Sequence, residues 1–275
     1  MDILSAPRPD EALRSSVLAG DLCGIQCEIH KLEKGNYPVT LSHAMRTCIG
    51  TRNIGAFRLL LQHGEVDESV AEEAARSEST EIVQAILDHG WPIDGRLRKG
   101  SLPSILSLAI RNSNFLEWLL AQGADPDATS TLSETALSFA VREGTMKVIK
   151  KLIAIGADVS RGDLLHSAAQ REPSSDTEEL IDILIRAGTP VDTYEFDNEV
   201  ARVLRYGFKL GTALHTACDE QNLLAADALL KHGADPYRLM KQRENLVPPT
   251  PLQLASRTPR MRDVLERHIG ARQSV

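Results

Sequence analysis

Apolar residues recur at four fixed positions before a glycine in six segments of this chain. Each segment carries them at the eighth, seventh, fourth and third residue before the glycine, as Val148, Ile149, Leu152 and Ile153 do before Gly156. Such spacings place side chains on one face of an α-helix. A glycine just after this face suits the left-handed residue that ends a helix. The pattern therefore predicts six amphipathic helices, which close at Gly64, Gly90, Gly123, Gly156, Gly188 and Gly233.

A shorter pattern lies about twenty residues before each closing glycine. Its clearest copies are Thr135–Ala140, Thr212–Ala217 and Thr250–Ala255, which read TALSFA, TALHTA and TPLQLA. Threonine is a good helix N-cap, proline suits the first turn, and small alanines let neighbouring helices approach. The glycines are 26, 33, 33, 32 and 45 residues apart. A period near 33 residues indicates stacked helix pairs instead of one conventional core.

These copies resemble the ankyrin repeat family, whose motif is Thr-Pro-Leu-His-x-Ala followed by a second helix and Gly-Ala-Asp. The resemblance covers residues 38–272 and implies an all-α solenoid of paired antiparallel helices with finger loops. We expect about seven repeats, at approximately residues 38–64, 65–90, 91–123, 124–156, 157–188, 189–233 and 234–272. The eroded repeats and uneven fingers also resemble divergent ankyrin repeat proteins of filamentous fungi.

The two ends of the array depart from the motif. Residues 1–37 are expected to form an N-terminal helix pair, either a degenerate repeat or a cap, across Glu11–Gly20 and Asp21–Lys34. Its apolar stripe is Leu22, Ile25, Ile29 and Leu32. The array proper spans residues 38–275. Its last helix keeps the apolar spacing only if Gly270 lies inside it, so we expect that helix to run to the end of the chain.

The fingers, defined as the loops from each closing glycine to the next helix cap, differ in length. They run 5, 14, 12, 7, 24 and 17 residues, where the regular pattern has 12. The long finger, residues 189–211, holds four of the eleven aromatic residues, namely Tyr194, Phe196, Tyr206 and Phe208. Either this insertion folds back on its own apolar residues, or its aromatic side chains form a contact surface for a partner.

A row of arginines is the second candidate site. In the ankyrin family, the residues seven and eight positions after the inner-helix cap face the concave groove. Five repeats place an arginine there: Arg76, Arg111, Arg142, Arg171 and Arg257. Arginine pairs well with planar carboxylates, so the row could receive an acidic ligand. The alternative is that these are solvated helix ends, because arginine is frequent at this position in the family.

Composition argues against several classes of protein. The net charge of −7 argues against nucleic acid as a partner, since phosphate binding needs a basic surface. Four scattered cysteines favour free thiols in a reducing compartment, and the first ten residues lack the apolar core of a signal peptide. No apolar stretch is long enough to cross a membrane. We therefore expect an intracellular protein, cytoplasmic or nuclear, and a monomer.

Catalytic chemistry has no residues to support it. Six of the eight histidines fit repeat positions, and Cys23 and Cys27 have no second pair with which to hold zinc. Phosphate-binding, nucleophile-elbow and metalloprotease motifs are absent. The expectation is therefore no enzyme, no metal and no cofactor.

The expected function is protein recognition through the concave groove and the fingers, as a scaffold or adaptor. The alternative is a stoichiometric regulator or accessory subunit of an enzyme or biosynthetic pathway. Since the repeats reach the last residues, we expect no attached kinase, channel, death or ubiquitin-ligase domain.

Overall fold

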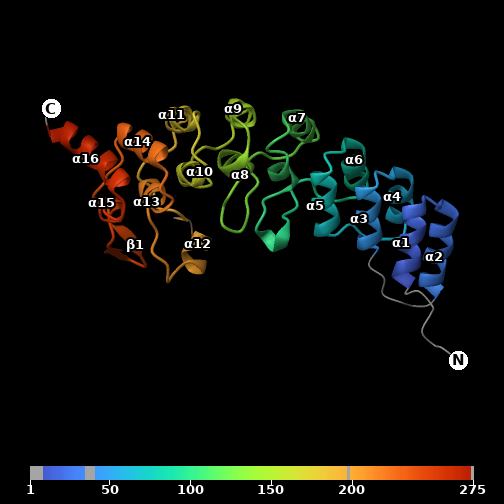
Figure 1. The fold of residues 1–275 in the computed structure, drawn as a ribbon. Helices are drawn as coiled ribbons and strands as arrows, with labels where there is room; N and C mark the ends of the chain where they lie inside the picture. Colours follow the sequence, from blue (N-terminus) through green and yellow to red (C-terminus); the bar gives the residue numbers. More distant parts are fainter. Residues whose placement is uncertain (1–8, 35–40, 197–198, 274–275) are drawn as a thin grey trace.

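The computed structural model describes residues 9–34, 41–196 and 199–273. Figure 1 shows a single file of helix pairs that curves into an arc, with the two ends of the chain at opposite ends of the arc. Each pair has an inner and an outer helix, and the fingers project beyond the inner row (Figure 1). Successive inner helices contact one another along the whole file, so the repeats form one continuous stack.

The inner row consists of α1 (Pro9–Ala19), α3 (Ser42–Gly50), α5 (Glu68–Arg76), the 3-10 helix η2 (Ile105–Leu108), α8 (Ala136–Glu143), α10 (Leu164–Gln170), α13 (Ala213–Asp219) and α15 (Pro251–Ala255). The outer row consists of α2 (Leu22–Lys34), α4 (Ile54–Leu61), α6 (Thr80–Asp88), α7 (Ser113–Ala121), α9 (Met146–Ala154), α11 (Thr177–Ala187), α14 (Leu223–Lys231) and α16 (Pro259–Gln273). The fingers add η1 (Arg98–Gly100), α12 (Glu199–Leu204) and the strands β1 (Met240–Gln242) and β2 (Asn245–Val247).

The core lies where the predicted apolar faces meet. In each of the six outer helices that carry the pattern, the first three apolar positions are buried. The fourth is buried in α4 and α14 and half-buried in α6, α7, α9 and α11. Burying such side chains contributes about 1.5–3 kcal/mol each, which is the main force that holds one repeat to the next.

Five of the six closing glycines have positive φ, between 92° and 113°. Gly64 does not, so the prediction of a left-handed residue there is wrong. A Cβ at Gly64 would lie 3.0 Å from both Leu41 Cδ1 and Met45 Cε. Glycine therefore serves close packing against the inner helix of the same repeat at this position.

One expectation about secondary structure also needs correction. The inner helix of the third repeat is only a 3-10 turn, η2, in which Ser107 Oγ donates to Ser104 O at 2.7 Å. The fold is all-α, as predicted, and the finger at residues 234–249 adds a two-stranded antiparallel hairpin in which Met240 pairs with Val247. A shorter bridge joins Leu210 of the long finger to Lys241.

The ends of the stack differ from their neighbours. Helices α1 and α2 pack together and onto α3 and α4, as expected of a cap. Leu22 was predicted to belong to the buried stripe of α2, but it is 46% exposed, because it begins the helix at the outer edge of the stack. At the other end α16 continues through Gly270 to Gln273, as the apolar spacing predicted.

One kind of hydrogen bond between fingers recurs along the stack, from a backbone N–H to an aspartate of the preceding finger. The backbone N–H of Asp125 donates to Asp94 Oδ1 at 2.9 Å, and that of Asp158 donates to Asp127 Oδ1 at 2.8 Å. Asp235 N–H donates to Asp192 at 3.2 Å in the same way. In each case the later finger supplies the donor and the earlier finger supplies the acceptor.

Candidate partner-binding surfaces

The arginine row begins with an ion-pair network at the end of α5. Arg76 Nε and Arg98 Nε each donate to Glu72 Oε1, at 3.0 and 3.1 Å. The Arg98 hydrogen bond, together with Arg76, lowers the pKa of the Glu72 carboxyl against the opposing effect of burial. Glu72 therefore stays ionised between two guanidinium groups, and Arg76 is already paired within the fold.

Arg142 and Arg111 form the middle of the row. Arg142 Nη1 donates to Glu134 at 3.0 Å, its Nε lies 3.7 Å from Glu143, and its guanidinium sits 4.7 Å from the ring centre of Phe139. Arg111 reaches the other oxygen of Glu143 only at 4.0 Å, and its side chain is 71% exposed. Arg142 is therefore held by three neighbours, whereas Arg111 is nearly free to turn to a partner.

The last two arginines of the row behave differently from each other. Arg171 Nη1 donates to the backbone oxygens of Val141 and Gly144, at 3.1 and 2.9 Å. It thus closes the end of α8 and has a structural role. Arg257 lies 3.7 Å from Asp219 and remains largely exposed. The row as a whole presents ion pairs to solvent, with Arg76, Arg111 and Arg257 the most accessible.

The insertion at residues 189–211 docks onto the next finger. Tyr194 Oη donates to Leu239 O at 3.0 Å, and the backbone groups of Leu210 and Lys241 exchange hydrogen bonds of 2.7 and 2.9 Å. Gln242 Nε2 donates to Gly207 O at 2.9 Å. The two C-terminal fingers are therefore one joined unit.

The four predicted aromatic residues divide into two pairs. Tyr194 and Phe196 are half-buried at the base of the insertion. Tyr206 and Phe208, which follow α12, are 58% and 57% exposed. The insertion thus packs one aromatic pair against the fold and leaves the other facing solvent.

Three arginines that were not predicted lie over these rings. The Arg205 guanidinium is 4.8 Å from the Phe196 ring centre and 5.4 Å from that of Phe208. Arg238 lies 5.2 Å from the Tyr194 ring and Arg243 lies 5.0 Å from the Tyr206 ring. Within the described residues, none of the three has a carboxylate within 4 Å. The sequence signal that could have found them is the placing of arginine beside the inserted aromatics.

Exposed apolar side chains collect in the same place. Of the ten large apolar residues that are exposed among the described residues, six lie in the two joined fingers: Val203, Leu204, Tyr206, Phe208, Tyr237 and Leu246. We call residues 194–196, 203–209 and 237–246 the C-terminal finger surface. Scattered exposed apolar residues are normal, but a cluster of this kind marks interaction sites.

A half-buried acid, Glu195, lies at the base of this surface. Burial, and next the nearby Asp163 carboxylate, raise the pKa of Glu195 to about 7, although Arg205 opposes the shift. The backbone N–H of Glu195 donates to Gly211 O at 3.0 Å, and that of Phe196 donates to Asp163 Oδ2 at 2.9 Å. Glu195 therefore titrates near neutral pH at the point where the insertion meets the stack.

Each of the two shortened fingers leaves a cavity in the row. One, of ≈ 410 Å³, lies around residues 159–165 between Ser133 and Thr193. The other, of ≈ 520 Å³, lies around residues 61–67 and is lined by Leu41 and His89. The shortened loops were predicted from the sequence, and the cavities show that the row of fingers is interrupted at both places.

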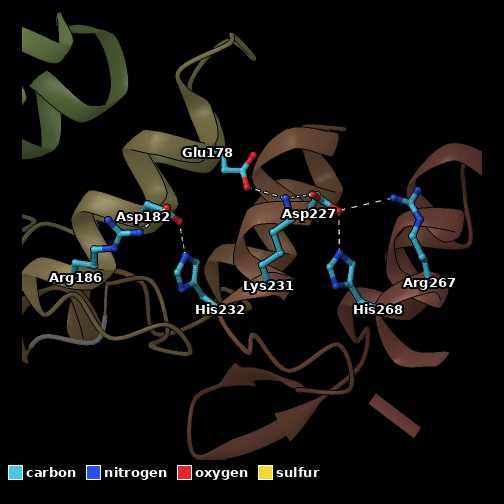
Figure 2. Close-up of polar contacts among 8 residues, drawn as sticks. All are labelled: Glu178, Asp182, Arg186, Asp227, Lys231, His232, Arg267 and His268. Atoms are coloured by element: carbon cyan, nitrogen blue, oxygen red, sulfur yellow. Dashed lines mark hydrogen bonds and ion pairs between the residues drawn. The ribbon is translucent and has the colours of Figure 1, made fainter. Parts of the chain in front are cut away.

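The outer helices of the last repeats carry a polar network (Figure 2). His232 Nε2, at the end of α14, lies 2.5 Å from Asp182 Oδ1 of α11, and His268 Nε2 of α16 lies 2.8 Å from Asp227 Oδ1 of α14. The hydrogen bond from His232 lowers the pKa of Asp182. Lys231 pairs with Asp227 at 3.0 Å. Since these contacts link three consecutive outer helices to one another, they have a structural role.

The histidines of the repeat motif vary in their surroundings. Nδ1 of His215 accepts from Thr212 N–H at 3.0 Å, while its Nε2 lies 3.3 Å from Pro249 O. His166 Nε2 donates to Gly211 O at 3.2 Å. His215 therefore caps its own helix, and both side chains also reach a carbonyl oxygen that precedes the next inner helix, whereas His43 is exposed. Burial lowers the pKa of His166 and of His215 to about 4, so both are neutral.

The described residues contain neither a metal-binding cluster nor a membrane-spanning helix. Across residues 9–34, 41–196 and 199–273, no three His, Cys, Asp or Glu side chains are arranged to hold a metal ion. No helix in these same ranges combines the length and apolar content needed to cross a bilayer.

Comparison with known proteins agrees with the fold. A family profile described as ankyrin repeats (3 copies) matches residues 106–194, and one for a single ankyrin repeat matches residues 210–238. Residues 195–209, which make up most of the insertion, lie between the two matches. The crystal structure of the human ASB11 ankyrin repeat domain superposes with a TM-score of 0.52 at 20% identity, over 72% of this chain and 82% of that one. Residues 106–194 and 210–238 are ankyrin repeats, and the described chain has the ankyrin repeat fold.

Two curated relatives match part of the chain. One is the ankyrin repeat and KH domain-containing protein mask-1 of Caenorhabditis elegans, 26% identical over 73% of this chain. The other is the transient receptor potential channel pyrexia of Drosophila melanogaster, 30% identical over 54% of this chain. The matches cover only 7% and 14% of the length of those relatives.

Proposed function

We propose that this chain is a non-catalytic scaffold or adaptor that binds a protein partner through the C-terminal finger surface and the adjoining concave groove. Ankyrin repeats are protein-interaction modules in general, and this chain adds one unusual element to them. The observation that carries the proposal is the gathering of Tyr206, Phe208, Tyr237 and Leu246 on two joined fingers. Aromatic residues on a rigid base are typical of interface centres.

The rigidity of this base supports the proposal. The hydrogen bonds from Tyr194 to Leu239 and between Leu210 and Lys241 fix the insertion to the next finger. A partner that binds there would meet a preformed surface, so less conformational entropy would be lost on binding. Arg111 and Arg257 are the most exposed members of the arginine row, and they are the candidates for contacts in the groove.

The test is quantitative capture of partners from an extract of the native cells. One variant replaces Tyr206, Phe208, Tyr237 and Leu246 with serine. A matched control replaces four other exposed apolar residues, Leu18, Leu22, Ile155 and Leu224, with serine. The wild type and the control should retain the same specific partner, and the finger variant should lose it.

Undiminished capture by a folded finger variant would contradict the proposal. The number of partners then separates the two modes of action. Two unrelated proteins held at once indicate an adaptor, whereas one enzyme whose rate changes on binding indicates a regulator.

A further inference from the structure

We propose that the C-terminal finger surface recognises an acidic segment of its partner that also carries a large apolar side chain. This inference rests on the function proposed above and adds the chemistry of the partner. Its twenty residues include Arg205, Lys209, Arg238, Lys241 and Arg243 against Glu195 and Glu244. The two fingers as a whole, residues 189–211 and 234–249, hold six basic and six acidic residues, so they carry no net charge on a protein of net charge −7, and their cations are concentrated on this surface.

The arginines are arranged to receive carboxylates. The guanidinium groups of Arg205, Arg238 and Arg243 each lie over an aromatic ring, with Cζ at 4.8 to 5.4 Å from the ring centres. Stacking uses the face of the group and leaves its N–H edge to bind a planar anion with two parallel hydrogen bonds. Stacking also orders the side chain before the ligand arrives, which reduces the entropy lost on binding.

The contrast with the arginine row strengthens this assignment. Arg76, Arg142 and Arg257 each have a glutamate or aspartate within ion-pair distance. Among the described residues, Arg205, Arg238 and Arg243 have an aromatic ring in that place instead. An acidic ligand at the row would have to displace an existing carboxylate, whereas no described carboxylate lies within 4 Å of Arg238 or Arg243.

A cavity beside the arginines can take an apolar side chain. It has a volume of ≈ 490 Å³ and lies between Tyr194, Tyr237 and Leu246, with Arg238, Lys241 and Glu244 also lining it. Tyr237 and Leu246 are 55% and 61% exposed, so burying them under an apolar group of the partner removes their surface from water. The ligand should therefore combine carboxylates with an aromatic or long aliphatic residue.

Basic and aromatic residues together can also bind single-stranded nucleic acid, which stacks its bases on open ring faces. Here the rings of Tyr194, Phe196, Tyr206 and Phe208 each already have a guanidinium over one face. The net charge of −7 would also repel a long polyanion. A short acidic peptide segment fits both facts better.

The experiment measures fluorescence anisotropy of labelled probes with the whole chain at low salt and at physiological salt. The main probe is a short peptide of alternating glutamate and leucine. The comparison probes are a glutamate–serine peptide, a lysine–leucine peptide and an oligouridylate of matched length. We expect the glutamate–leucine peptide to bind best, and added salt to weaken its binding.

Two variants locate the binding. Arg238→Gln with Arg243→Gln changes two exposed side chains, and adding Arg205→Gln completes the set. Each should lower the affinity for the glutamate–leucine peptide by about tenfold or more, which corresponds to about 1.4 kcal/mol. The matched control, Arg58→Gln with Arg267→Gln, changes two arginines of the outer helices whose side chains are 60% and 68% exposed, and it should leave the affinity unchanged. The double variant removes any doubt over folding that the half-buried Arg205 would raise.

Three results would overturn the inference: equal affinity of the double variant and the wild type, equal affinity for the lysine–leucine peptide, or tighter binding of oligouridylate. If the serine variant of the finger surface loses its partner while the acidic peptide fails to bind, only the partner's chemistry is wrong. If that serine variant keeps its partner, the proposed function itself fails.

Discussion

The side-chain amide of Asn222 donates to the carbonyl oxygen of Ala169 at 3.1 Å, which ties the start of α14 to the end of α10 in the repeat before it. The same amide reaches Arg171 O at 3.0 Å, and its own oxygen accepts from Ala225 N–H at 3.0 Å. Asn222 is 1% exposed. One buried side chain therefore caps a helix and joins two repeats.

Replacing Asn222 with alanine should lower the free energy of unfolding by about 2–3 kcal/mol, since it leaves buried backbone groups without partners. Asn53 offers a matched control: it caps α4 by accepting from Ala56 N–H at 3.0 Å but is only half-buried. Asn53→Ala should cost about 1 kcal/mol. Urea unfolding curves measure both, and equal losses would show that the bonds to the preceding repeat add nothing.

Glu195 should make the protein less stable as the pH rises. In the unfolded chain its carboxyl ionises near 4.5, whereas in the fold its pKa is about 7. Between these values the unfolded state has released a proton that the fold retains, so the stability contribution falls with increasing pH. Glu195→Gln should therefore be more stable than the wild type by roughly 1–3 kcal/mol at about pH 8 and equal to it at about pH 4. Denaturant melts at the two pH values test this, and an unchanged difference would refute it.

His215 has the opposite effect on stability to Glu195, because it should make the protein less stable as the pH falls. Burial lowers its pKa from 6.5 to about 4, so the fold resists a proton that the unfolded chain accepts. Stability is therefore lost as the pH falls from 6.5 towards 4. In another repeat Gln253 Oε1 accepts from Thr250 N–H at 2.9 Å, the same bond that His215 Nδ1 makes to Thr212.

His215→Gln should keep this cap and remove the titration. Between about pH 7.5 and about pH 5 the variant should lose roughly 1–2 kcal/mol less stability than the wild type. His166, which has the same sign of shift, leaves a residual pH dependence in both proteins. A variant that is less stable at both pH values with the same slope would rule out the titration of His215.

Charge reversal in the arginine row should separate folding from binding. Arg142→Glu places a third carboxylate beside Glu134 and Glu143 in a side chain that is 26% exposed, so it should cost about 2 kcal/mol or more. Arg111→Glu changes a side chain that is 71% exposed and should cost less than about 0.5 kcal/mol. Thermal melts compare the two, and equal shifts would contradict the difference in their surroundings. Only Arg111→Glu then reports on a groove ligand.

The outer helices could be predicted because their apolar spacing is local and six copies agree. The conformation of Gly64 could not be predicted, since its packing against Leu41 and Met45 depends on residues some twenty positions away. The 3-10 winding in the inner segment of the third repeat was not predicted either. There the Ser107 hydroxyl bonds to Ser104 O.

The candidate surfaces were predicted only in part. The partnership of Arg76 with Glu72 follows from their i, i+4 spacing, but Arg98 joins them from the next finger, twenty-six residues on. The aromatic insertion was visible in the sequence. The three arginines over its rings were not, because two of them come from the following finger and meet the rings only after the fingers dock.

The direction of the three hydrogen bonds that aspartates accept from the following finger has a consequence for synthesis of the chain. Asp94, Asp127 and Asp192 each hold an acceptor that waits for a backbone donor made later. A ribosome releases the amino-terminal repeats first, and their aspartates can be hydrated until the next unit emerges. At these positions the backbone donor is therefore always synthesised after its acceptor. The nascent chain can then assemble repeat by repeat as it leaves the exit tunnel.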